Sequence, residues 1–235
     1  MALAARTRWS EVMGLRGIRN IGLLALGAVA AERGLRGRYE SWGATLDEVR
    51  ATLPGDGIVP EPQRVSTRAI FIDAPADDVW PWLVQIGHAR GGLYSYDWLE
   101  NLVGCDLHSA NQVLPEYQEL RRGDLVRMGP EGYPTFSVVE VDPPHHLILV
   151  SADPRTGRTT LEGSRPAGTT WQWAIEPLEG CCRLITRQRL TYPPGQAAMW
   201  SVIQPIAFAM ERKMLLGIRQ RAEQVRPQAQ RPVAR

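Results

Sequence analysis

The stretch of sequence that says most about the fold is residues 79–102, which read VWPWLVQIGHARGGLYSYDWLENL. Three tryptophans and two tyrosines lie inside two short helical patterns, which a glycine-rich turn joins. Two helices of this length are too small to bury five aromatic rings between them, because each ring needs about 150–250 Å² of covering surface. We therefore expect this pair to close against a larger apolar surface formed by the rest of the chain.

The first helix of the pair has clear start and stop signals. Pro75 opens it, because the first helical position needs no N–H, and Asp77 and Asp78 favour the positive end of the helix dipole. Gly87 ends it. Apolar residues with i, i+3, i+4, i+7 spacing share one face: Val79, Trp82, Leu83 and Ile86.

The second helix is expected to start at Ser95, a suitable N-cap residue. Its apolar residues predict a buried side made of Trp98, Leu99, Leu102 and Val103.

From Glu116 onward the apolar pattern has a period of two, which predicts strands. The candidates are residues 68–73 before the helix pair, then 123–128, 135–142, 145–152, 169–176 and 181–191, with a weaker one near 115–120. In strand 169–176 the large apolar residues Trp171, Trp173 and Ile175 face one way. A run of consecutive strands predicts an antiparallel sheet.

Residues 196–226 form the longest helical pattern, and Pro205 is expected to bend it. One apolar stripe follows the helix: Met199, Ile203, Ile206, Met210, Met214, Ile218, Ala222 and Val225. The polar complement consists of Gln204, Glu211, Arg212, Arg219 and Glu223. The element order predicts an α+β helix-grip fold, in which a curved antiparallel sheet of about six or seven strands wraps a long C-terminal helix, with two short helices after the first strand.

The first forty residues differ from the rest, since seven arginines flank the uncharged stretch 21–31. Three interpretations remain open: a helix packed on the domain, a basic amphipathic segment on an anionic membrane surface, or a secretory signal starting at Met13. Further on, Thr45 to Glu48 fits a capping box. Residues 57–66 resemble a linker.

Composition narrows the function classes. The net charge of +2 is too small to imply a nucleic-acid surface, and no apolar run reaches the roughly 18–20 residues that span a bilayer. The three cysteines, Cys105, Cys181 and Cys182, are odd in number and two are adjacent. A disulfide framework is therefore not expected, and a cytoplasmic location is favoured over secretion. A peripheral membrane contact through residues 1–40 stays one of the open alternatives.

The segment Ala74-Pro75-Ala76-Asp77-Asp78-Val79-Trp80 after the first strand, together with the element order, resembles the START-like superfamily of polyketide cyclases and lipid-transfer domains. The run from Trp82 to Asp97 is similar to a bacterial subgroup of it. The resemblance covers residues 66–226 and implies a helix-grip domain over 65–228, with an extension and linker over 1–64 and a tail over 229–235. It also implies a cavity for an apolar ligand and carries no shared catalytic residue.

The candidate ligand-binding residues come from three places in the sequence. Residues of the helix pair and its turn would orient a ligand, the tryptophan strand would bury it, and the final helix would line the pocket: Trp82, His88, Arg90, Tyr94, Tyr96, Trp98, Trp171, Trp173, Met199, Ile203, Ile206 and Met210. Alternatively, the side chains of the turn only hold neighbouring backbone, and the methionine stripe is plain core.

Two further groups of residues carry weaker signals. Arg183, Arg187 and Arg189 share one face of the last strand, either as a charged exterior or as an inner face that needs acidic partners. Cys105 and His108, with the pair at 145–146, lack the spacing of a metal site, so no metal and no cofactor are expected.

We expect binding or transport of a small hydrophobic or amphipathic ligand. The alternatives are a cyclase- or aromatase-type enzyme acting on a polyketide-like substrate, and a protein-interaction or chaperone-assisting module. No catalytic residue is assigned, and whether the protein is an enzyme stays open, with binding favoured.

Overall fold

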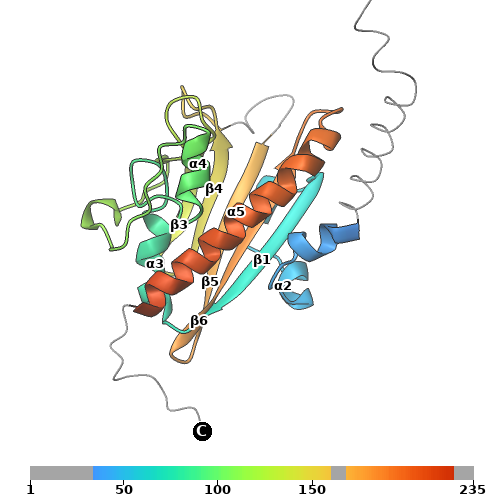
Figure 1. Cartoon of the computed structure of the whole chain (residues 1–235). Helices are drawn as coiled ribbons and strands as arrows, with labels where there is room; N and C mark the ends of the chain where they lie inside the picture. Colours follow the sequence, from blue (N-terminus) through green and yellow to red (C-terminus); the bar gives the residue numbers. More distant parts are fainter. Residues whose placement is uncertain (1–33, 160–167, 225–235) are drawn as a thin grey trace, which may run out of the picture.

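A six-stranded antiparallel sheet carries one long helix, α5, diagonally across one face (Figure 1). The computed structural model describes residues 34–159 and 168–224. The strands are β1 (Arg64–Ile72), β2 (Leu125–Arg127), β3 (Thr135–Asp142), β4 (His146–Ala152), β5 (Gly168–Leu178) and β6 (Cys181–Thr191), and α5 spans Ala197–Gln224. This is the predicted helix-grip architecture, so the fold class is confirmed.

The strands lie in the order β1-β6-β5-β4-β3-β2, so the first strand pairs with the last. The predicted strands 135–142 and 181–191 are confirmed to the residue, whereas the first strand begins four residues earlier than predicted. The prediction of a weaker strand near 115–120 was wrong. This stretch instead contains the short 3-10 helix η2 (Pro115–Tyr117), because Pro115 has no N–H to offer a strand partner and suits the start of a helical turn.

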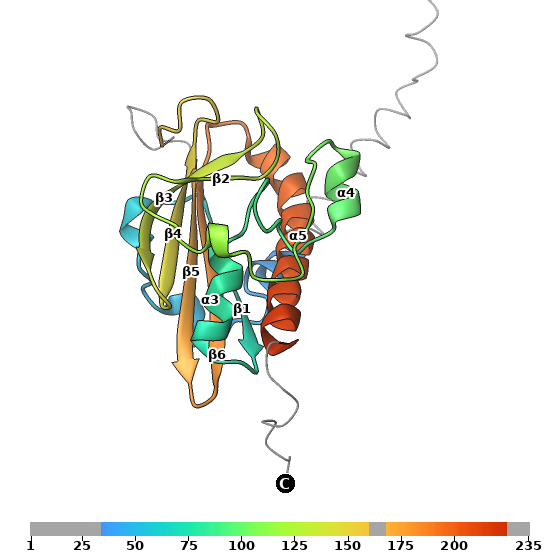
Figure 2. The ribbon, with the colours of Figure 1, turned by 90° about the vertical axis from the view of Figure 1, so that its left-hand side faces the viewer.

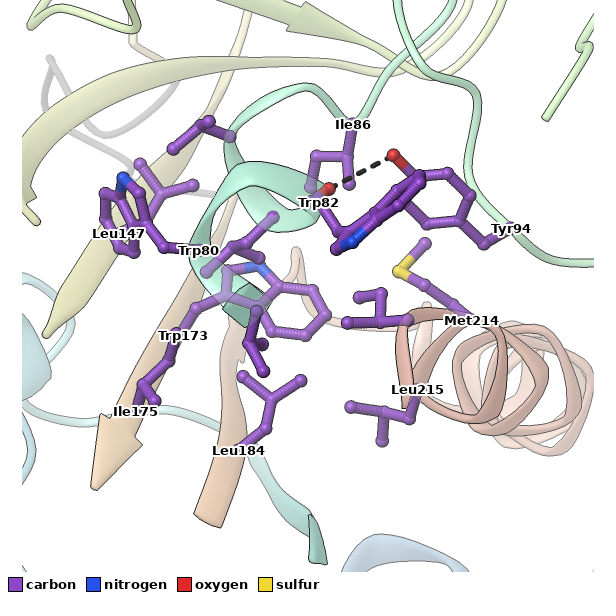
Figure 3. Close-up of a cluster of buried hydrophobic side chains, with 14 of the residues drawn as sticks. Trp80, Trp82, Ile86, Tyr94, Leu147, Trp173, Ile175, Leu184, Met214 and Leu215 are labelled. Carbon is purple, nitrogen blue, oxygen red and sulfur yellow. Dashed lines mark hydrogen bonds between the residues drawn. The ribbon is translucent and has the colours of Figure 1, made fainter. Parts of the chain in front are cut away.

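The second half of α5 packs into the core. Helix α3 (Ala76–Val84) packs against this half and against β5, and the large side chains of all three elements meet there (Figure 3). Trp82 and Leu83 of α3, Trp173 of β5, and Met214 and Leu215 of α5 are all buried in one cluster. This end of the molecule therefore has a solid interior.

The first half of α5 differs from the prediction of one continuous buried stripe. Met199, Val202 and Ile206 are 46%, 68% and 58% exposed, while Gln204 and Glu211, predicted on the outer face, are buried. The seven-residue spacing of 204, 211 and 218 places these residues on the face toward the sheet. Glu211 tolerates burial because Arg68 of β1 forms an ion pair with it.

Helix α4 (Asp97–Leu102) stands away from the sheet, on the same side as α5 (Figure 2). Its N-cap is Tyr96 rather than Ser95, whose hydroxyl donates instead to the Met210 carbonyl at 3.1 Å. The predicted buried side was also wrong, because Trp98, Leu99, Leu102 and Val103 are exposed and Glu100 is buried. The reason lies in the neighbouring loop: Asn101 exchanges two hydrogen bonds with the Leu107 backbone and thus turns the polar side of α4 inward.

The convex face of the sheet is covered by residues 43–60, including α2 (Leu46–Arg50) with its predicted Thr45–Glu48 capping box, and the 3-10 helix η1 (Asp56–Ile58). Arg187 of β6 is buried there and donates to Asp56 at 2.7 Å and to the Glu48 carbonyl at 2.7 Å. Arg183 pairs with the Glu48 carboxylate. Arg183 and Arg187 therefore face neither solvent nor the cavity. They hold the covering segment, residues 43–60, against the sheet.

Several predictions lie outside the described residues. The alternatives for residues 1–40 concern mainly 1–33, and the tail 229–235 and Val225 of the apolar stripe are also outside. Within residues 34–40 the chain is helical, and Tyr39 lies beside Phe208 of α5 with ring centroids 6.0 Å apart.

The close approach of Gly217 in α5 to Tyr94 in the loop after α3 yields a stability prediction. A Cβ added at Gly217 would fall against the Tyr94 carbonyl and 2.8 Å from the Tyr94 Cβ. We expect Gly217→Ala to lower the free energy of unfolding by about 1–3 kcal/mol in urea denaturation, because the overpacking outweighs the better helix propensity of alanine. The matched control is Gly37→Ala, which adds a Cβ to a helical glycine with open space around it. Equal effects of the two substitutions would contradict the prediction.

Candidate functional site

A cavity of about 600 Å³ lies between the concave face of the sheet and the first half of α5. It occupies the end of the molecule opposite the tryptophan core, where α5 exposes its apolar side chains. Its lining residues come from the 134–136 segment, β4, β5, β6, the loop after β6, and α5: Pro134, Thr135, Phe136, Ser151, Ala152, Gly168, Thr169, Gln188, Leu190, Thr191, Tyr192, Pro193, Gln196, Trp200, Ile203, Gln204 and Ala207.

The walls of the cavity are mainly apolar. Phe136 projects from β3 and contacts Trp171, with the two ring centroids 5.4 Å apart. On the opposite wall Trp200 stacks on Tyr192 at 6.1 Å. Ile203 and Leu190 complete this apolar surface. Side chains of this kind bind an apolar molecule by removing its surface from water.

A polar network lies beneath Gln188 and centres on the Glu211 carboxylate. Glu211 accepts hydrogen bonds from Trp171 Nε1 at 3.0 Å, from Gln188 Nε2 at 3.1 Å and from the Thr186 hydroxyl at 3.2 Å. Its other oxygen pairs with the Arg68 guanidinium. The carboxylate therefore has partners on both oxygens, and it fixes the amide of Gln188 at the cavity surface.

The types of the lining side chains determine the charge of the cavity surface. Each described residue that lines it has a side chain that is apolar, a hydroxyl, an amide or glycine. Tyr192 is the titratable one among them. Such a surface suits a neutral apolar body with a few hydrogen-bonding atoms rather than a ligand of high charge.

The predicted residues of the turn between the two helices hold the backbone rather than line this cavity. Arg90 donates to the Val84 carbonyl at 3.0 Å and to the Tyr117 carbonyl at 3.2 Å, and lies over the Tyr117 ring. Burial lowers the pKa of Arg90. Tyr94 is buried, donates to the Trp82 carbonyl at 3.1 Å, and its pKa is raised by burial. His88 is half-buried, and its backbone N–H donates to the Arg127 carbonyl at 2.7 Å.

The predicted tryptophans lie in three places. Trp82 and Trp173 belong to the solid core, and Trp171 lies between that core and the cavity. Trp98 is exposed on α4 and, with Tyr94 and Tyr96, lines a different pocket.

Among the predicted residues of α5, Ile203 lines the cavity. Met199 and Ile206 are exposed, and Met210 is half-buried, with its carbonyl bound by Ser95.

The candidate ligand-binding residues predicted from the sequence did not include Phe136, Leu190, Gln188 and the buried Glu211. Two signals were available: the period-two pattern of β3 and β6, and the seven-residue spacing of Gln204, Glu211 and Ile218 on one helix face. The partner of Glu211, Arg68, lies 143 positions away in sequence. That separation leaves no local pattern to detect.

No group of three or more histidine, cysteine or acidic side chains that could hold a metal ion occurs within residues 34–159 and 168–224. In the same ranges no helix is both long and apolar enough to cross a membrane. The three cysteines are free thiols, and burial raises the pKa of Cys182 to about 11.

The comparisons with known proteins give structural likenesses at low sequence identity. No family model and no curated protein matches the chain. Among solved structures, protein NE0264 from Nitrosomonas europaea aligns with 69% of this chain and 96% of its own, at 16% identity and a TM-score of 0.43. The di-domain ARO/CYC StfQ from the steffimycin biosynthetic pathway aligns with 68% and 50%, at 12% identity and a TM-score of 0.40. The Aha1 dimer from Colwellia psychrerythraea aligns with 66% and 98%, at 13% identity and a TM-score of 0.38. At these scores the likenesses carry no argument about function.

The Arg68–Glu211 pair under the cavity yields a second prediction. We expect Glu211→Gln to lower the free energy of unfolding by about 3–5 kcal/mol, because it leaves the buried Arg68 charge uncompensated. Arg68→Gln should have a similar effect, and the double variant should lose less than the sum of the two, with a coupling energy of about 1–3 kcal/mol. Urea denaturation of the three variants measures this cycle, and additive losses would show that the pair does not interact.

Glu100 of α4 yields a prediction about pH. Burial, then the nearby charge of Asp97, raises the pKa of Glu100 to about 7 from 4.5. Because the folded state holds this proton more tightly than the unfolded chain, folding is favoured below the unfolded pKa, and this contribution is lost as pH rises through about 7.

We therefore expect the free energy of unfolding of Glu100→Gln to increase by about 1–2 kcal/mol relative to that of the wild type when the pH is raised from about 5 to about 8. Urea denaturation at both values measures it. The exposed Glu131→Gln makes the same charge change and should leave the pH dependence as in wild type. Parallel pH curves for wild type and Glu100→Gln would refute the assignment.

Proposed function

We propose that this protein binds a small hydrophobic or amphipathic molecule in the cavity between the sheet and the first half of α5. The observation that carries the proposal is a cavity of about 600 Å³ whose described lining is apolar or neutral. Pockets of about 300–1,000 Å³ with mainly apolar walls and few polar groups are typical small-molecule sites. The resemblance of residues 66–226 to the START-like superfamily, itself part of the proposal, supports the same function.

Apolar burial would supply most of the affinity, and amides would set the orientation. Phe136, Leu190 and Ile203 offer surface that a ligand can cover. Gln188 is held in position by Glu211 and Gln204 is buried on the helix face above it, so two amide groups are available to a ligand's carbonyl or hydroxyl.

Binding is favoured over acid–base chemistry by the state of the carboxylate beneath Gln188. A cyclase-type reaction needs a proton donor and acceptor that reach the substrate. Glu211 is buried beneath Gln188 and engaged on both oxygens, which makes it a support for the cavity surface.

A neutral fluorescent probe such as Nile red tests the proposal. We expect probe fluorescence to increase on adding the protein, and Ile203→Trp to weaken probe binding at least about ten-fold, because the larger side chain fills the cavity. Val202→Trp is the matched control, since the neighbouring residue is exposed and lies outside the lining. Native mass spectrometry of protein purified from its own host should show a co-purifying apolar molecule.

Equal probe binding by the two tryptophan variants would place the probe elsewhere on the protein. Failure of the wild type to bind any neutral apolar probe would overturn the proposal.

A further inference from the structure

A second pocket, of about 670 Å³, lies on the other side of α5 and shares no residue with the cavity. The 94–98 segment, the 109–111 loop and the second half of α5 enclose it. Its lining is polar and aromatic: Tyr94, Ser95, Tyr96, Asp97, Trp98, Ser109, Asn111, Lys213, Gln220, Arg221 and Gln224.

Two cations of α5 face this pocket. The Lys213 ammonium lies 5.9 Å from the centre of the Tyr96 ring. Arg221 lies over the Tyr94 ring at 4.6 Å and donates to the Ala110 carbonyl at 2.7 Å and to Asn111 Oδ1 at 3.0 Å. Neither cation forms an ion pair with a described carboxylate at 4.0 Å or less.

The one acidic side chain of the pocket lining is already engaged. Asp97 accepts a hydrogen bond from the Ser109 backbone N–H at 2.7 Å and another from the Ser109 hydroxyl at 2.6 Å. Burial lowers the pKa of Arg221, which means that its charge is partly desolvated, and the nearby side chains of Tyr94 and Asp97 oppose this shift. A partly desolvated cation gains more from a bound anion than a cation in water does.

An apolar surface continues directly from the pocket wall along α4. Trp98, Leu102 and Val103 are 67%, 74% and 66% exposed. Trp98 and Leu102 are four residues apart and so lie on the same face of the helix. α4 projects away from the rest of the protein on this side (Figure 2). The projecting tryptophan and leucine suit the acyl-chain boundary of a lipid surface, and the cationic pocket beside them suits its anionic headgroups.

We propose that α4 and this second pocket form a docking site for an anionic phospholipid bilayer. The lipid phosphate binds Lys213 and Arg221, and Trp98, Leu102 and Val103 enter the boundary between headgroups and acyl chains. The inference does not depend on the proposed function, because the two sites share no residue.

Co-sedimentation of the full chain with vesicles tests the proposal. We expect binding to vesicles of phosphatidylcholine with phosphatidylglycerol and much weaker binding to phosphatidylcholine alone. Lys213→Gln should weaken binding about five-fold, which corresponds to about 1 kcal/mol per cation at an anionic surface. Arg212→Gln is the matched control: it removes the same charge from the same helix, at a side chain that lies over Trp42.

The apolar contact is tested separately. Trp98→Ser combined with Leu102→Ser should weaken vesicle binding at least about ten-fold. Leu178→Ser, which removes an exposed leucine at the far end of β5, should leave it unchanged. Circular dichroism of each variant confirms folding.

Three outcomes would overturn the proposal. Equal losses in Lys213→Gln and Arg212→Gln would show general charge attraction without a site. Full vesicle binding by the Trp98/Leu102 double variant would exclude insertion of α4. Binding of glycerol phosphate that depends on Lys213, together with no binding to anionic vesicles, would identify a site for a soluble phosphate compound.

Discussion

The buried carboxylate of Glu211 determines how α5 lies on the sheet. A charge in this position is tolerated because Arg68 of β1 pairs with it and because Trp171 and Gln188 donate to it. These partners come from three strands, β1, β5 and β6, so one side chain at the middle of the helix fixes its distance from the sheet. On one side of this point the helix packs into a solid core, and on the other it borders the cavity.

The same helix therefore presents three different environments. Its second half contributes Leu215 and Ile218 to the core, its first half contributes Trp200 and Ile203 to the cavity, and its outer side carries Lys213 at the second pocket. A single amphipathic stripe cannot describe such a helix. The proposed functions at its two sides are physically separate, since one depends on apolar burial and the other on a phosphate and an interface.

The sequence predicted the architecture well because that information is local. Alternation of large residues located the strands, and Pro75 and the Thr45 capping box located helix starts. Gly87, the predicted helix end, lies three residues beyond the end of α3 at Val84. Prediction from the sequence failed where a distant partner decides the outcome. From the sequence, Glu211 and Gln204 were predicted to be surface residues, because their distant partners, Arg68 and the sheet, leave no local signal. The apolar side of α4 was predicted to be buried, because the hydrogen bonds between Asn101 and Leu107 leave no such signal either. The cavity itself, formed by residues 134–207 from five separate segments, has no counterpart in any short motif.

Pro205 lies in α5 between Trp200 and Glu211, where the helix passes from the cavity to the packed half. Proline has no N–H, so the carbonyl of Ser201 lacks its usual intrahelical partner at this turn. The rotation of one helical segment against the other therefore meets less resistance here than elsewhere along α5. A small swing of the first segment about this joint would widen or narrow the space above Gln188 without disturbing the tryptophan core, so a binding site of the proposed kind would accept ligands of different width.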